Sequence, residues 1–269
     1  MASQHGPRPS DGASRPAGDD ASDQEDVAET RSPGFLYAFG RGVVAPLARS
    51  LYRPRVLGKK NVPKTGPVIL ASNHLSFIDS IVIPVVAPRR VQFLAKSVYF
   101  EGKGVGGWAQ RSFFTAIGAV GVRRGAGQAA QDALEQSKRI LEEGNAFALY
   151  PEGTRSLDGR LYKGRTGVAW LALTTGAPVV PVGLIGTDQL QPVGAKIPRF
   201  RKVIVKFGEP IDVAAHGGAN SGRARRQATD EIMAAIQKLT GQEEAGVYNE
   251  VPPSGAVERI KRALPHERV

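Results

Sequence analysis

Cysteine is absent from this chain of 269 residues, which excludes a disulfide framework, a thiol nucleophile and a thiolate metal site. The sequence also lacks an uncharged apolar run of about 18 residues, so it predicts no transmembrane helix. No serine stands in a Gly-x-Ser-x-Gly elbow, and Ser76 and Ser156 are therefore not expected to act as nucleophiles. Any chemistry must come from other side chains.

Acidic residues are scarce outside the amino terminus. The chain carries a net charge of +11, and residues 1–31 hold three Arg against seven Asp or Glu, a net of −4, so the remainder carries +15. A domain this basic favours an anionic partner such as a phosphate ligand, a lipid surface or nucleic acid. We expect no nucleic acid partner, because the basic residues are scattered and no helix-turn-helix, zinc finger or aromatic platform is present.

The chain divides by composition into four parts. Residues 1–32 are polar and predict a disordered acidic tail, and residues 241–269 predict a loosely held C-terminal tail. Residues 33–54 have apolar positions three and four apart, which predicts an amphipathic helix. This helix either packs on the core or lies in a membrane interface with its arginines at lipid phosphates, and we favour the membrane. Residues 55–240 form the predicted main domain.

Strand and helix patterns alternate through the main domain. They predict a single α/β domain with a mostly parallel central sheet flanked by helices, preceded by the amphipathic N-terminal helix. Strands are expected at 55–60, 67–71, 91–95, 117–122, 147–150, 179–184 and 203–207, and helices at 80–86, 128–143, 164–175 and around 232–239. The glycine-rich segment 100–114 predicts a mobile loop with a short helix, which is either an apolar lip near a site or a packing segment.

His74 and Asp79 are the first candidate pair, in the segment 73–79 that follows the predicted strand 67–71. Residues five apart on a regular helix point to different faces, because each residue turns by ~100°. The two side chains meet only if His74 precedes the helix and Asp79 lies inside it. Asp79 then accepts the proton of one ring nitrogen, which leaves the other nitrogen to take a proton from an alcohol.

A second motif, Tyr-Pro-Glu-Gly-Thr-Arg-Ser at 150–156, also follows a predicted strand. Lys96 follows another strand, and Arg123 and Arg124 follow a third. Loops at the carboxyl ends of the strands of an α/β sheet share one crevice, where ligands bind. The sequence therefore predicts a site that combines a histidine base with several cations.

His74 with Asp79, and Glu-Gly-Thr-Arg at 152–155, resemble the signature of the glycerolipid acyltransferases, in particular the bacterial lysophosphatidate (1-acylglycerol-3-phosphate) acyltransferases. The resemblance runs from about residue 56 to about residue 239. It includes the blocks 118–124 and 178–182 in the order the family has them, and four ordered blocks are more specific than any one of them.

The resemblance implies transfer of an acyl chain from acyl-CoA or acyl-ACP to the free sn-2 hydroxyl of lysophosphatidic acid, giving phosphatidic acid. His74 is then the general base and Asp79 orients it. Because a thioester is already reactive, no covalent intermediate, tightly bound cofactor or metal is implied. Two alternatives stay open: an acyltransferase acting on another lysolipid, and a non-catalytic protein that binds anionic membranes.

The resemblance also implies residues that bind substrate. Arg155 and Arg124 are expected to hold the phosphate of the acceptor, with Lys96 assisting. Many family members carry an acidic or neutral residue in place of Arg123, so we assign the family's arginine to Arg124. Glu152 is expected to bind acceptor hydroxyls or to tie Arg155 in place. Gly153 and Thr154 are further candidate substrate-binding residues of the same motif. Backbone N–H groups near Gly153 or at the His74 turn are the candidate oxyanion donors.

The expected partners are a lysophospholipid acceptor, an acyl thioester donor and an anionic membrane surface. We expect a peripheral or monotopic protein at the cytoplasmic face of the cell membrane. A basic cluster of Lys196, Arg199, Arg201 and Lys202 either meets the membrane or the phosphates of a carrier, or forms a solvated edge.

Overall fold

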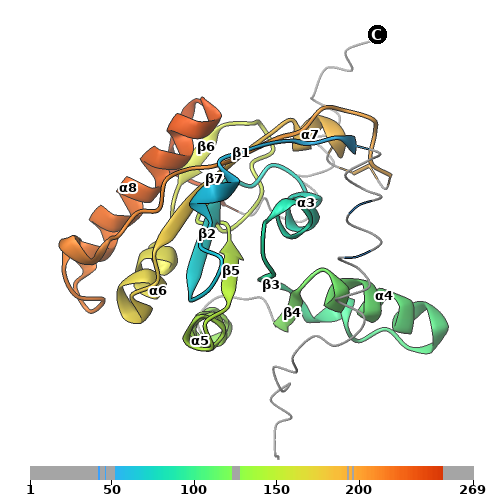
Figure 1. Ribbon diagram of the computed structural model, residues 1–269, viewed down its shortest axis with the longest axis horizontal. Coiled ribbons are helices and arrows are strands. Elements are labelled where there is room, and N and C mark those ends of the chain that lie inside the picture. Colours follow the sequence, from blue (N-terminus) through green and yellow to red (C-terminus); the bar gives the residue numbers. More distant parts are fainter. Residues whose placement is uncertain are drawn as a thin grey trace, which may run out of the picture. The chain divides into compact units, whose positions relative to one another are not determined.

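The computed structural model describes residues 42, 46, 52–122, 128–192, 194–195 and 197–250 (Figure 1). In this part of the chain the central sheet has seven strands, in the order β1-β8-β7-β2-β5-β3-β4. The bounds are β1 Arg55–Leu57, β2 Val68–Ser72, β3 Val91–Lys96, β4 Ala119–Val122, β5 Ala146–Leu149, β7 Val179–Ile185 and β8 Ile204–Phe207. All pairs are parallel except β7 with β8, which confirms the predicted mostly parallel sheet.

Helices cover both faces of this sheet. They are α3 Asp79–Val86, α4 Gly104–Ala116, α5 Gln128–Glu142, α6 Gly167–Thr175, α7 Thr187–Leu190 and α8 Gly222–Thr240. Single 3-10 turns occur at η2 Lys59–Asn61, η3 Ser97–Tyr99 and η4 Ala214–His216. Helices α5, α6 and α8 lie on one side of the sheet, and α3 and α4 lie on the other (Figure 1).

The side chains of β2 alternate between the two core clusters, one on each face of the sheet. Val68 and Leu70 pack in the core cluster that holds α3, whereas Ile69 and Ala71 pack in the cluster that holds α5, α6 and α8. Successive side chains of a strand point to opposite faces, so a strand buried on both faces has an apolar run without polar gaps. All five residues of β2 are buried. The loop that carries His74 therefore starts from a strand that is buried on both faces.

The prediction of a mobile loop with a short helix at 100–114 is wrong, because α4 runs for 13 residues. Glycine is tolerated inside this helix for a steric reason. A Cβ at Gly107 would lie 2.1 Å from the backbone of Gly102, so the bare glycine lets the preceding loop fold against the helix. The close approach needs glycine, and its cost in helix propensity is offset by this packing.

The predicted domain boundary at residue 240 is too early. Glu244–Tyr248 form strand β9, which pairs in parallel with β6, Leu161–Lys163. The ordered chain therefore continues past α8 and returns to the loop that follows β5. The predicted tail at 1–32, the predicted helix apart from residues 42, 46 and 52–54, and residues 251–269 lie outside the described residues.

Candidate active site

The site lies at the carboxyl ends of two neighbouring strands. Strand β2 leads into the turn that carries His74, and β5 leads into the loop that carries Arg155. Because β2 and β5 pair in parallel, the two loops leave the sheet side by side. They are joined directly, since the Ser156 N–H donates to the His74 carbonyl at 2.7 Å. The two motifs, which begin 77 residues apart in sequence at Asn73 and Tyr150, thus form one structural unit.

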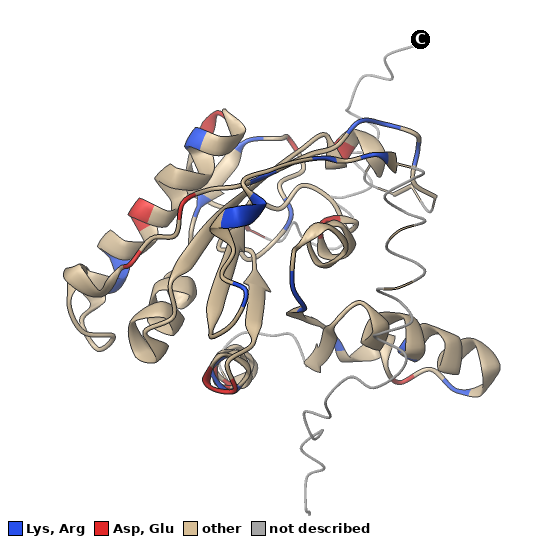
Figure 2. Cartoon of the chain, in the orientation of Figure 1, with Lys and Arg blue, Asp and Glu red and all other residues tan. Residues whose placement is uncertain are grey.

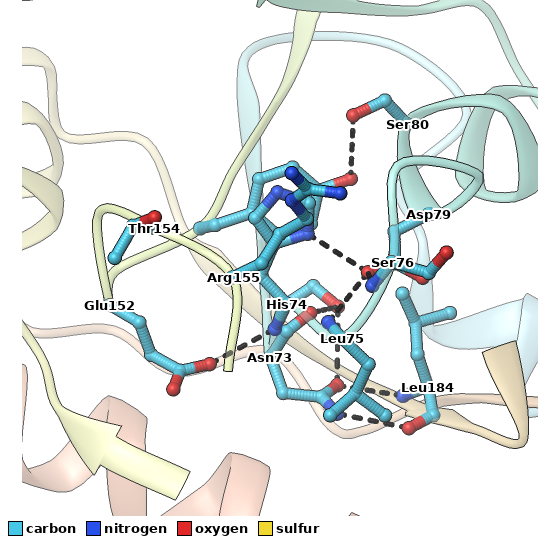
Figure 3. Close-up of polar contacts among 12 residues, drawn as sticks. Asn73, His74, Leu75, Ser76, Asp79, Ser80, Glu152, Thr154, Arg155 and Leu184 are labelled. Atoms are coloured by element: carbon cyan, nitrogen blue, oxygen red, sulfur yellow. Dashed lines mark hydrogen bonds and ion pairs between the residues drawn. The ribbon is translucent and has the colours of Figure 1, made fainter. Parts of the chain in front are cut away.

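His74 and Asp79 are in contact. The imidazole Nδ1 lies 2.9 Å from Asp79 Oδ2 (Figure 3). His74 precedes α3 and Asp79 is the first residue of that helix, which confirms the predicted placement of the pair. Asp79 is fully buried, whereas the His74 side chain keeps 12% of its surface exposed. The ring is therefore fixed at one edge and accessible at the other.

Asp79 also holds the backbone of the turn. Its Oδ2 accepts hydrogen bonds from the N–H groups of Leu75 at 2.7 Å and Ser76 at 2.8 Å. One carboxylate oxygen thus fixes both the turn and the imidazole. On the other side of the turn, the Asn73 side chain exchanges two hydrogen bonds with the backbone of Leu184, of 2.9 and 2.8 Å, which anchors the turn to β7.

Tyr150 contacts the imidazole face, and sequence reasoning missed this role. The two rings stack with centroids 3.8 Å apart and planes 10° from parallel. The Tyr150 hydroxyl lies 3.1 Å from Ser80 Oγ on α3. An aromatic residue at the start of the second motif was the only available signal. The imidazole is thus restrained at its edge by Asp79 and across its face by Tyr150.

Glu152 lies beneath the turn and is fully buried. Its Oε1 accepts from the His74 N–H at 3.0 Å, and its Oε2 accepts from the Tyr162 N–H at 3.0 Å. Burial raises the pKa of Glu152 to about 7, against the lowering effect of these two N–H donors. The expectation that Glu152 binds acceptor hydroxyls or ties Arg155 is wrong, because both oxygens hold backbone instead.

One cavity of about 110 Å³ opens beside the imidazole. Its wall is formed by His74, two cations, a serine and a set of apolar side chains. The lining residues are His74, Phe77, Ser80, Ile81, Phe93, Leu94, Ala95, Lys96, Tyr99, Phe114, Ile117 and Arg155. No acidic residue is in this set.

Lys96 and Arg155 bring positive charge to the cavity. Lys96 is the last residue of β3, and Arg155 lies in the loop after β5. Both side chains are exposed, and neither has a hydrogen-bond or ion-pair partner within the described ranges. The structure therefore brings together His74, Lys96 and Arg155, as the sequence predicted. Arg124 lies outside the described residues.

Gly153 and Thr154 do not line the cavity, contrary to expectation. Gly153 has a φ of 79° and makes the turn after Tyr150, whose carbonyl accepts its N–H at 3.0 Å. The N–H groups of Gly153 and His74 themselves are both donated within the protein, to the Tyr150 carbonyl and to Glu152. Oxyanion donors among the other N–H groups near Gly153 or at the His74 turn stay a prediction.

The C-terminal segment supports the Arg155 loop. Asn249 Nδ2 donates to the Arg155 carbonyl at 3.1 Å and lies 3.5 Å from the Thr154 carbonyl. Gln242 bridges the two loops, because its Oε1 accepts from Asn73 at 2.9 Å and its Nε2 donates to the Gly159 carbonyl at 2.6 Å. Sequence reasoning missed both residues, since short polar stretches after a final helix give no periodic signal.

Comparison with known proteins places this fold and site in a class. Residues 53–185, which include both motif loops, match the Acyltransferase family. The 1-acyl-sn-glycerophosphate (LPA) acyltransferase PlsC from Thermotoga maritima has a similar crystal structure, with a TM-score of 0.53 and 26% identity over 76% of this chain and 78% of that chain. Residues 53–185, just under half of the chain, therefore carry the similarity to the acyltransferase family.

Within that family the chain resembles 1-acyl-sn-glycerol-3-phosphate acyltransferases. The chloroplast enzymes of that name from Brassica napus and Arabidopsis thaliana are each 32% identical over 146 residues, or 54% of this chain. The matched segment spans 41% and 39% of those two proteins. The chain thus covers about two fifths of the length of these curated relatives.

Proposed function

We propose that the protein transfers an acyl chain from an acyl thioester, acyl-CoA or acyl-ACP, to the free sn-2 hydroxyl of lysophosphatidic acid, giving phosphatidic acid in phospholipid biosynthesis. One observation carries the proposal. A histidine held by a buried carboxylate shares a cavity with two cations, and the described residues supply neither a partner for these cations nor an acid to the cavity wall. The site therefore combines a base for a hydroxyl with a receptor for a phosphate.

His74 is the proposed general base. An ionised Asp79 can only accept hydrogen bonds, so the proton of the neutral imidazole is placed on Nδ1. The Nε2 lone pair is then free to take the proton of the acceptor hydroxyl as that oxygen attacks the thioester carbonyl. Asp79 stabilises the imidazolium that forms, and Tyr150 restricts tilting of the ring. The tetrahedral intermediate collapses with release of the thiol, and the proton on His74 leaves with it.

Lys96 and Arg155 are proposed to hold the phosphate of the acceptor. A guanidinium fork and an ammonium group both form charge-assisted hydrogen bonds with phosphate oxygens. No acid among the described residues of the cavity wall compensates their charges, so the site favours a dianion. The apolar wall at Phe77, Ile81 and Phe114 suits the start of an acyl chain next to the headgroup.

The names of the relatives support lysophosphatidate among the possible acceptors, and a terminal phosphate matches the two cations better than a phosphate capped by choline. The donor is proposed to be a thioester of either carrier, without a bound cofactor or metal. We propose a peripheral position at the cytoplasmic face of the membrane. No helix in the described ranges is both long enough and apolar enough to cross a bilayer.

The test is a thiol-release assay with acyl-CoA and, separately, acyl-ACP. Acceptors are lysophosphatidate, lysophosphatidylcholine, a lyso-ornithine lipid and a glycosylated lipid. We expect release that depends on lysophosphatidate and yields phosphatidic acid. Faster turnover of another acceptor would change the assigned acceptor but leave the assigned reaction, acyl transfer, unchanged. No acceptor-dependent release with either donor would overturn the proposed function.

A further inference from the structure

Helix α4 presents an apolar face that no other part of the described structure covers. Val105 is 83% exposed, Trp108 58% and Phe113 40%. Val105, Trp108 and the exposed Ala109 are spaced three and four apart and share one face of the helix. Contiguous exposed apolar surface of this kind marks an interaction site. The helix contains no Asp or Glu, and Figure 2 draws most of it in tan.

The opposite side of the same segment borders the site. Phe114 on α4 and Tyr99 on the preceding turn η3 line the cavity beside His74, and their rings stack 4.5 Å apart. Val98, next to Tyr99, is exposed to solvent. One short segment therefore has apolar side chains on the cavity wall and apolar side chains facing solvent. A partner bound to the exposed face of α4 would therefore contact the helix that also contributes Phe114 to the cavity wall.

A second exposed segment combines apolar and basic side chains. Phe200 is 72% exposed and stacks on Tyr52, with ring centroids 5.7 Å apart. Arg199, Arg201 and Lys202 surround it and are exposed, and their side chains have no partner within the described ranges. This loop and α4 both lie on the α3 side of the sheet (Figure 1), and blue marks the loop in Figure 2.

We infer that α4 docks into the surface of an anionic lipid bilayer, with Val105, Trp108 and Phe113 inserted at the level of the acyl chains and headgroups. Aromatic and aliphatic side chains beside Lys and Arg are the composition of an interfacial anchor. Lys103 at the N-terminus of α4 and the cations around Phe200 are complementary to anionic headgroups. The choice of a bilayer over a protein rests on the proposed function, since a lipid substrate must enter the site from a membrane.

Tryptophan makes the inference testable without a label. The chain has two tryptophans, Trp108 on α4 and Trp170 on α6, and α6 lies on the other face of the sheet. The variants Trp170→Phe and Trp108→Phe each leave one of them in the full chain. Vesicles of phosphatidylcholine mixed with phosphatidylglycerol are prepared with and without bromine on the acyl chains. Bromine quenches only tryptophans that reach the acyl chains.

We expect brominated vesicles to roughly halve the fluorescence of the protein that keeps Trp108, because interfacial helices bury their apolar face several Å into the acyl boundary. The protein that keeps Trp170 should be unaffected. Binding should weaken with added salt, since the headgroup attraction is screened. Equal quenching of both, or none at Trp108, would overturn the inference. A blue shift of Trp108 that grows with protein concentration in the absence of vesicles would also overturn it, in favour of a second copy of the chain.

A matched pair of substitutions checks the same face by sedimentation with vesicles. Val105→Asp places a charge on α4, and Val247→Asp places the same charge at another valine that is 58% exposed, on β9. We expect Val105→Asp to weaken vesicle binding by about tenfold or more, and Val247→Asp to leave it unchanged. Equal effects would contradict a docking face on α4.

The two experiments distinguish membrane docking from the proposed reaction. Quenching of Trp108 without thiol release would refute the proposed function alone. Thiol release without quenching would refute this inference alone.

Discussion

The two loops of the site differ in how their functional side chains are held. In the turn after β2, His74 is restrained through its ring edge by Asp79, through its ring face by Tyr150 and through its N–H by Glu152. In the loop after β5, the Arg155 carbonyl accepts from Asn249, but the guanidinium is exposed and has no partner in the part of the chain that the structure describes. Under the proposed function, the base is therefore positioned before substrate binds, whereas the Arg155 cation finds its partner only in the substrate phosphate. One loop thus carries the proposed base, and the other carries the positive charge proposed to bind the substrate phosphate.

The largest effect is expected at the base. His74→Ala should lower acyl transfer by about 10²–10⁴-fold, the usual contribution of a general base, because no other side chain of the cavity can take the hydroxyl proton efficiently at neutral pH. Unfolding in denaturant should be nearly unchanged, since the ring is partly exposed. An activity within twofold of the parent protein would remove His74 from the mechanism.

Asp79→Asn tests the edge restraint on the ring. The amide keeps the size of the side chain but carries no charge to stabilise the imidazolium, so transfer should fall by about 10²-fold or more. Because Oδ2 also accepts from the N–H groups of Leu75 and Ser76, thermal unfolding should occur earlier than in His74→Ala. Loss of stability with full activity would show that Asp79 only shapes the turn.

Arg155→Ala tests the role of the exposed guanidinium in the loop after β5. Loss of charge-assisted hydrogen bonds to phosphate should raise the KM for lysophosphatidate by about 10- to 100-fold, with a smaller effect on kcat. Arg160→Ala is the control in the same loop, because Arg160 pairs with Asp158 at 2.7 Å and does not line the cavity. A rise in the KM of the acyl donor alone would contradict the assignment.

Two substitutions of Tyr150 distinguish its stacking on His74 from its hydrogen bond with Ser80. Tyr150→Leu removes the ring that faces the imidazole and should lower kcat by about 2- to 10-fold, the worth of an aromatic pair, with little change in the KM of either substrate. Tyr150→Phe keeps the ring and loses the contact with Ser80, so its kcat should stay within about twofold. Equal losses in both variants would assign the effect to the hydroxyl.

Glu152 is expected to have the smallest effect on rate, because its contribution is to stability. Burial raises the pKa of Glu152 from 4.5 to about 7, so between these values the folded state binds more protons than the unfolded state. The free energy of unfolding should therefore fall as pH rises through this window, by at most about 3 kcal/mol from this group. Denaturant unfolding at several pH values should show that Glu152→Gln flattens this slope. An unchanged slope would mean that Glu152 titrates normally.

The sequence predicted the parts of the site that follow from local order. His74 and Asp79 are five residues apart across a strand-to-helix turn, and Lys96 and Arg155 follow strands, so a parallel sheet was sufficient to bring them together. Glu152 was misjudged because a polar residue in a loop motif usually faces solvent or ligand, whereas here the turn above it buries it. Its role depends on backbone donors that no side-chain pattern reveals.

Other features depend on contacts between distant segments. Strand β9 was missed because a five-residue stretch with an internal glycine has little strand character of its own, and its partner β6 lies about 80 residues earlier. Helix α4 was shortened in prediction because its glycines lower helix propensity, while the packing of Gly107 on Gly102 is visible only in three dimensions. The stacking of Tyr150 on His74 likewise requires the two loops to be placed first.

The most direct test of the central claim, one cavity holding both a base and a phosphate receptor, is the ratio of kcat/KM for lysophosphatidate to that for monoacylglycerol, which lacks the phosphate. We predict a large preference for lysophosphatidate in the parent protein. The preference should collapse by about 10²-fold or more when Lys96 and Arg155 are both replaced by alanine, with residual transfer still dependent on His74. An undiminished preference in that double variant would contradict the account, because the phosphate would then be recognised elsewhere.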